Sequence, residues 1–168
     1  MLDTLYNFAL QTGILGFMNS AWGWPIIESL HFVGLCLLLG TVGVFDLRML
    51  GVARGVNYSD LHRLVPFGVA GFGLNIVTGT MFVVSAPDQY LFNPAFLSKL
   101  GFMLIAGLNM LCFYTLCARG VRATEASEQV LGSAKAIAGV SLVSWSLVIV
   151  CGRLITYYRP PYHWCWLC

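Results

Sequence analysis

Trp24-Pro-Ile-Ile-Glu-Ser-Leu-His-Phe-Val-Gly-Leu-Cys-Leu-Leu-Leu-Gly40 is an apolar run with a glutamate and a histidine inside it. The run continues to Phe45 and is long enough to cross a bilayer, which takes about 20 residues. Ionisable groups in such a segment are costly, and they usually face a partner or a cavity rather than lipid. Glu28 and His31 are three residues apart and therefore share one helix face. The run predicts a membrane-spanning helix with a polar site near one membrane surface.

The composition extends this prediction to the whole chain. Of the 168 residues, 58% are hydrophobic and 10% are charged, whereas soluble domains carry about 25% charged residues. Four apolar spans are predicted, at residues 25–45, 64–86, 94–117 and 134–158. Because the connections are short, neighbouring spans should pack antiparallel. The sequence therefore predicts an all-α fold, a single integral membrane four-helix bundle that contacts the lipid bilayer.

Both ends of the chain are predicted to lie at the membrane surface. Residues 2–20 gather their apolar side chains towards one side, which is typical of an interfacial amphipathic helix. Trp22 and Trp24 then mark the level of the lipid headgroups. The segment 159–168 is an aromatic tail, and tyrosine and tryptophan prefer the membrane interface.

Basic residues gather in two of the three predicted connections. These residues are Arg48, Arg54 and Arg63 in the first connection, and Arg119, Arg122 and Lys135 in the third. Because cytoplasmic loops carry an excess of lysine and arginine, both connections are predicted to face the cytoplasm. The chain is then a multi-pass protein of the bacterial inner membrane with both termini in the periplasm.

A stripe of small residues runs along the second span. Gly71, Asn75 and Gly79 recur every four residues and share one helix face. Small residues let two helix backbones approach closely, and an asparagine can hydrogen-bond across the contact. This face is predicted to meet another helix, with a functional polar lining by Asn75 as the alternative.

Four ionisable residues come together at the periplasmic end of this topology. Glu28 and His31 belong to the outer third of the first span, Lys99 to the start of the third, and Arg153 to the outer third of the fourth. A structural interpretation pairs Glu28 with Arg153 or Lys99, which offsets the penalty of burying either charge alone. In a functional interpretation, Glu28, His31 and Arg153 bind a cofactor.

Soft metal ligands are also predicted at the periplasmic end of the bundle. Imidazole, thioether and thiolate groups are ligands that copper accepts, and the candidates are His31, Met81, Met103, His163, Cys165 and Cys168. A structural zinc site would need a second ligand pair besides one C-x-x-C. The two tail cysteines can instead form a disulfide in an oxidising compartment. The combination of imidazole, thioether and thiolate groups is typical of a copper site.

Haem b and quinone are the alternatives to copper. An imidazole can bind haem iron, and a Glu–His pair can relay protons to a quinone. His31 and His62 are predicted to lie a membrane apart, which is ~30 Å of hydrocarbon, and so cannot hold one haem together. A haem at His31 would need His163, Met81 or Met103 as its second axial ligand.

One set of residues runs through the first two spans: Trp24-Pro25, Glu28, His31, Gly34, Gly40, Asp46-Leu47-Arg48 and Leu61-His62-Arg63. This set resembles a family of small bacterial four-helix inner-membrane proteins whose function is not assigned. It is more distantly similar to the membrane part of the CopD-type copper-resistance proteins. The resemblance implies a copper association centred on His31. The chain departs from the CopD pattern by having three histidines and no methionine-rich loop.

Three functional hypotheses follow. The first is a periplasm-facing site around Glu28 and His31 that binds copper or a redox cofactor and passes it on without covalent catalysis. The second is a redox subunit that carries haem or handles quinone. The third is a structural subunit of a larger membrane complex or a docking partner for a periplasmic protein. The chain contains no nucleophile motif or phosphate loop that would indicate an enzyme. Its net charge of +2 is too small to suggest nucleic acid.

Overall fold

The computed structural model describes residues 2–52, 55–117 and 132–158. Four long helices dominate it: α3 (Gly23–Leu50), α5 (Val65–Ser85), α7 (Pro94–Cys112) and α9 (Gly132–Leu154). A π-helical turn, η1 (Phe113–Cys117), extends α7. All four helices are long and apolar enough to cross a membrane. This confirms the predicted all-α four-helix membrane bundle.

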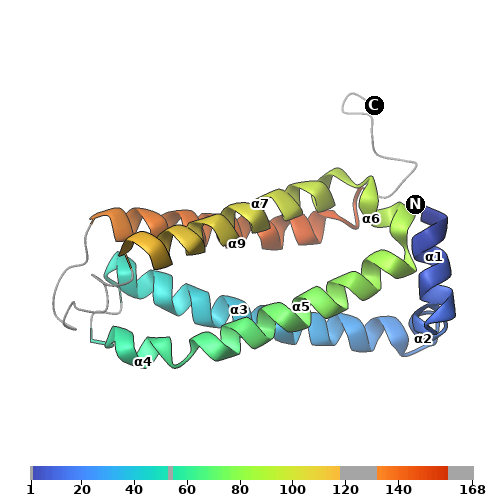
Figure 1. Ribbon diagram of the computed structural model, residues 1–168, viewed down its shortest axis with the longest axis horizontal. Coiled ribbons are helices and arrows are strands. Elements are labelled where there is room, and N and C mark those ends of the chain that lie inside the picture. The colour runs from blue at the N-terminus through green and yellow to red at the C-terminus, as the bar shows by residue number, and fades with distance from the viewer. Residues whose placement is uncertain (1, 53–54, 118–131, 159–168) are drawn as a thin grey trace.

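The four helices form two antiparallel hairpins. α3 packs along α5 and α7 packs along α9, and α3 joins the two hairpins by contacting α9. Because α3 and α5 cross, the C-terminal half of α3 approaches α9, while the C-terminal end of α5 approaches α6 (Pro87–Leu91) (Figure 1). The two ends of the bundle are therefore built differently.

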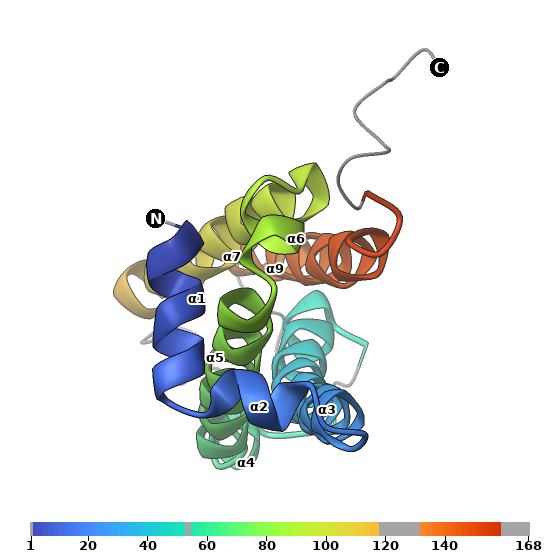
Figure 2. The same cartoon turned by 90° about the vertical axis from the view of Figure 1, so that its right-hand side faces the viewer.

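Two short helices precede the bundle. α1 (Leu2–Gln11) and α2 (Ile14–Met18) lie across the end of α5, where α6 also lies (Figure 2). Gly13 separates them with a φ of 75°, a left-handed conformation that glycine adopts without strain. Leu15 packs with Val84 in a small apolar cluster. The predicted helix over residues 2–20 is thus two helices with a turn between them.

α3 continues beyond the predicted span 25–45, through Asp46 and Arg48 to Leu50. Gly51 ends the helix with a φ of 93°, and its N–H donates to the Arg48 carbonyl at 3.0 Å, as is common at helix C-termini. The two charged residues are 4% and 1% exposed, respectively. Neighbouring helices cover both of them, so both charged side chains lie within the protein.

The predicted small-residue stripe lies where α3 and α5 cross. A Cβ atom added to Gly71 would lie 2.6 Å from the Gly34 carbonyl oxygen, and one on Gly34 would lie 2.9 Å from the Gly71 carbonyl oxygen. Asn75 is buried beside them, and its Nδ2 donates to the Gly71 carbonyl at 3.0 Å. The prediction that this face meets another helix is confirmed, and the backbones touch because neither glycine has a side chain.

Asn93 holds the start of α7 against the end of α9. Its Oδ1 accepts hydrogen bonds from the backbone of Ala95 and Phe96, and its Nδ2 donates to the carbonyls of Ile155 at 3.0 Å and Tyr158 at 2.9 Å. An N-cap side chain satisfies backbone donors that the first helical turn leaves free. Asn93 is fully buried. One side chain therefore caps a helix and ties the ends of the second hairpin together.

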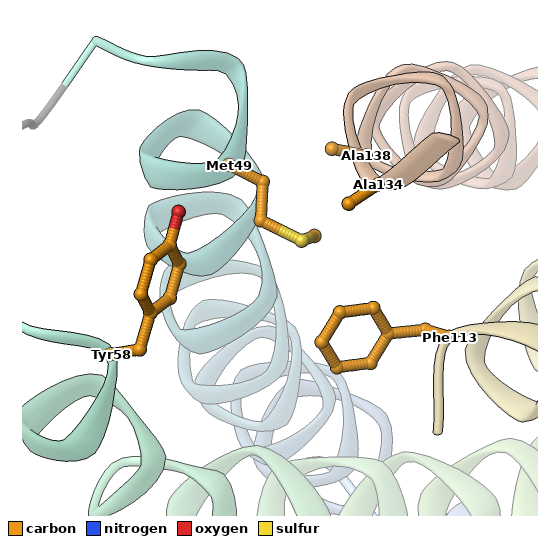
Figure 3. Close-up of a cluster of buried hydrophobic side chains, with 5 residues drawn as sticks. All are labelled: Met49, Tyr58, Phe113, Ala134 and Ala138. Carbon is orange, nitrogen blue, oxygen red and sulfur yellow. The ribbon is translucent and has the colours of Figure 1, made fainter. Parts of the chain in front are cut away.

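A buried cluster closes the opposite end of the bundle (Figure 3). It contains Met49 of α3, Tyr58, Phe113 of η1, and Ala134 and Ala138 of α9, which belong to four different elements of the fold. Met49 points from α3 towards the helix that carries the two alanines, whose small side chains allow close packing. The cluster explains why α3 approaches α9 at this end.

Tyr58, in the short helix α4 (Tyr58–His62), supports Arg48 with its ring. The Arg48 guanidinium carbon lies 4.4 Å from the ring centroid, and the Arg48 Nε donates to the Val56 carbonyl at 2.7 Å. The Tyr58 hydroxyl is buried and has no hydrogen-bond partner among the described residues. Burial raises the pKa of this phenol, and the charge of Arg48 partly offsets the shift.

Tyr58→Phe is expected to leave the free energy of unfolding unchanged within about 0.5 kcal/mol, or to raise it. The variant keeps the ring beneath Arg48 and removes a buried hydroxyl that has no partner, and leaving such a group unpaired costs about 1–3 kcal/mol. Tyr58→Leu should destabilise the fold, because it removes the cation–π contact. Thermal unfolding in detergent, followed by circular dichroism, measures both. A Tyr58→Phe variant as unstable as Tyr58→Leu would contradict this account.

Candidate functional site

His31 is a partly buried polar side chain of α3 at the end of the bundle that α1 and α2 cover. Its Nδ1 lies 2.7 Å from the hydroxyl oxygen of Thr78 on α5. Thr78 is 1% exposed, and a histidine on one helix is thus bound to the neighbouring helix of its own hairpin. Thr78 stands beside the small-residue stripe, three residues after Asn75, but the sequence did not predict its contact with His31.

The hydrogen bonds of Thr78 assign the tautomer of His31. The Thr78 hydroxyl has a single proton and lies 2.8 Å from the Leu74 carbonyl, to which it donates. It must then accept from His31, so that Nδ1 carries the proton. In a neutral imidazole Nε2 consequently keeps its lone pair. No partner for Nε2 occurs among the residues that the structure describes, so this nitrogen is available to a ligand.

Aromatic rings line the same end. Phe82 meets the His31 ring edge-on, with centroids 5.7 Å apart, and stacks on Trp24 at 5.1 Å. Tyr90 also stacks on Phe82, with ring centroids 6.5 Å apart, and meets Phe96 edge-on with centroids 5.5 Å apart. The series runs from α3 through α5 and α6 to α7. It places flat apolar surfaces beside an imidazole with a free nitrogen.

Lys99 of α7 supplies a positive charge near this imidazole. Its ammonium is close enough to interact electrostatically with His31. The side chain lies against α9, where a Cβ atom on Gly152 would be 3.7 Å from Nζ. Gly152 therefore leaves room for the ammonium. Lys99 was predicted at this end as an ion-pair partner, and the structure places it as a charge near His31.

Glu28 and Arg153 do not join this arrangement. Both side chains are exposed, and within the described ranges no ion pair links Glu28 to Arg153 or Lys99. Glu28 is one helical turn from His31, but it points out of the bundle, while His31 packs against α5. The predicted structural ion pair is therefore absent among the described residues. The assignment of Glu28 and Arg153 as cofactor-binding residues has no supporting contact.

The predicted metal ligands are only partly placed. Met81 and Met103 are partly buried on α5 and α7. His163, Cys165 and Cys168 lie outside the described residues. Over residues 2–52, 55–117 and 132–158, no group of three histidine, cysteine or carboxylate side chains is close enough to hold a metal ion. The described histidine, cysteine and carboxylate side chains around His31 therefore form no three-ligand metal site by themselves, nor do they offer a second histidine for haem.

A second polar group lies at the other end of the bundle. Asp46 of α3 is 4% exposed, and the Ser141 hydroxyl of α9 hydrogen-bonds its carboxyl group. From the sequence, Arg48 was counted with the basic residues of the first connection. The burial of Asp46 and Arg48 could not be read from the sequence, because it depends on α9 covering this face of α3.

Comparisons with known proteins add no relative: no family model, curated protein or solved structure matches this chain. The similarity to the CopD-type proteins therefore stays a prediction from the first two spans. Any function must be argued from the geometry around His31.

Proposed function

We propose that this protein binds a quinol, a small aromatic carrier with ring hydroxyl groups, in the outer half of a bacterial inner membrane. The His31–Thr78 hydrogen bond carries the proposal, because it leaves Nε2 as an acceptor. A quinol hydroxyl would donate to Nε2. Lys99 would face the second oxygen or the negative charge that develops when a hydroxyl loses its proton.

Charge favours a quinol over a metal cation at this place. Two unit charges 4 Å apart interact by about 4 kcal/mol at an effective dielectric constant of 20. The Lys99 ammonium would repel a copper ion beside His31 and attract an anionic oxygen. The rings of Trp24 and Phe82 suit a flat ligand, since offset aromatic stacking is favourable.

The membrane supports the same choice of ligand. Four helices are apolar enough to span a bilayer, and an apolar quinol is concentrated in that phase. The positive-inside pattern of the basic connections supports an orientation with His31 in the periplasmic half and both termini in the periplasm. A membrane complex that delivers or removes electrons would be the partner of such a binding protein.

Binding of decyl-ubiquinol to the detergent-purified protein, followed by tryptophan fluorescence, tests the proposal. Saturable quenching is expected, and Trp24→Phe should remove much of it because Trp24 stacks on Phe82. His31→Ala should weaken binding at least tenfold, which is about 1.4 kcal/mol. Lys99→Met should weaken it to a similar extent.

Two further variants control this experiment. Glu28→Gln, one turn from His31 on the exposed side, should bind as the unaltered protein does. His31→Asn can still donate to Thr78 but lacks Nε2, so it should fold normally and bind weakly. Binding that survives His31→Asn overturns the proposal. Stoichiometric Cu⁺ that is lost in His31→Ala, or a Soret band in the purified protein, would replace it with the copper or haem hypothesis.

A further inference from the structure

Asp46 is the most deeply buried carboxyl group among the described residues. Its side chain is 4% exposed, whereas Asp3, Glu28, Asp60 and Asp88 are all exposed. It stands next to Phe45, which packs on the buried cluster of Figure 3. Fifteen residues of α3 separate it from His31, or about 22 Å at 1.5 Å per residue. It is therefore independent of the proposed quinol site.

The contacts of Asp46 provide hydrogen-bond partners for only part of its carboxyl group. The Ser141 hydroxyl hydrogen-bonds the carboxyl group, but Oδ2 is buried without a partner. A buried ionised group that lacks hydrogen bonds or a counter-charge is very costly and tends to become neutral instead. The last carbonyls of α3 lie close by, and their partial negative charge disfavours an anion further.

The neighbouring ionisable groups do not neutralise Asp46. Arg48, two residues along α3, is directed to the Val56 carbonyl and the Tyr58 ring. α5 carries no ionisable side chain. The other described ionisable groups at this end are Tyr58, Asp60 and His62 of α4, Arg63 at its C-cap, Cys112, Tyr114 and Cys117 of α7 and η1, and Lys135 of α9. None of them forms an ion pair with Asp46 in the part of the chain that the structure describes.

We infer that Asp46 is a proton-binding site, a neutral carboxylic acid held between α3 and α9 at neutral pH. The bound proton removes the charge from a carboxyl that a single hydroxyl cannot stabilise. Ser141 then hydrogen-bonds one carboxyl oxygen of the neutral acid. This gives the bundle a protonatable group in the half opposite His31.

Infrared spectroscopy of the protein in lipid vesicles tests the inference directly. The chain contains four aspartates, at positions 3, 46, 60 and 88, and three of them are exposed. Aspartate labelled with ¹³C should therefore shift one protonated-acid carbonyl band at neutral pH. Asp46→Asn should abolish this band, and Ser141→Ala should move it to higher frequency because a hydrogen bond is lost.

If Asp46→Asn fails to fold, the spectrum of the labelled, unaltered protein still tests the inference. A labelled spectrum with carboxylate bands alone, and no protonated-acid band, would overturn the inference. So would a protonated-acid band that persists in Asp46→Asn. Asp60→Asn is the matched control, since it replaces an exposed aspartate and should leave the protonated-acid band in place.

Discussion

Replacing Gly71 by alanine is expected to lower the free energy of unfolding by about 2–3 kcal/mol. The new Cβ atom would lie 2.6 Å from the Gly34 carbonyl oxygen and 2.8 Å from the Leu38 backbone nitrogen. Both are backbone atoms of α3, so no side-chain rotation can relieve the overlap. α3 and α5 would have to move apart, and the contact between His31 and Thr78 would lengthen.

Gly73→Ala is the matched control on the same helix. A Cβ atom on Gly73 would have no neighbour within 4 Å, and alanine is the better helix former by up to about 1 kcal/mol. Denaturation of both variants in mixed micelles, followed by circular dichroism, makes the comparison. Equal stability of the Gly71 and Gly73 variants would show that α3 and α5 do not cross as described.

Asn93→Ala should lower the free energy of unfolding by about 3 kcal/mol. Loss of the N-cap accounts for about 1 kcal/mol, and the two part-buried carbonyls of residues 155 and 158 each lose a donor worth about 1 kcal/mol. The loss should be largest for the second hairpin, because Asn93 joins the start of α7 to the end of α9. Amide hydrogen exchange measured by mass spectrometry should show faster exchange there.

Asn93→Ser separates the two roles of this side chain. Serine supplies a capping oxygen but cannot reach the carbonyls of Ile155 and Tyr158. It should therefore recover about a third of the stability lost in Asn93→Ala. A serine variant as stable as the unaltered protein would show that the bonds to the end of α9 contribute nothing.

The sequence predicted the helices better than it predicted their partners. The lengths of the apolar stretches alone predicted all four spans, because a helix that crosses the lipid bilayer must be apolar over about 20 residues. The spacing of Gly71 and Asn75 also predicted a close helix contact, which the crossing of α3 and α5 confirms. The sequence did not predict that helix α3 continues to Leu50 or that its charged residues Asp46 and Arg48 are buried.

The candidate site was predicted only in part. His31 was identified because an imidazole in an apolar run is costly. Its contacts with Thr78 and Phe82 depend on how α5 is aligned with α3, which residue spacing within one helix does not define. Glu28 was grouped with His31 because three-residue spacing places both on one side. That side is wide enough for one to face α5 and the other to point outward.

The crossing of α3 and α5 has a consequence for biogenesis. Each hairpin buries its own seam, through Gly34 and Gly71 in the first and through Asn93 in the second. Each can therefore enter the bilayer as a preassembled unit, and the contact of α3 with α9 then joins the two. If the hairpins insert in this order, Ser141 meets Asp46 only when the two halves dock, and docking then creates the environment that disfavours a charge on the carboxyl.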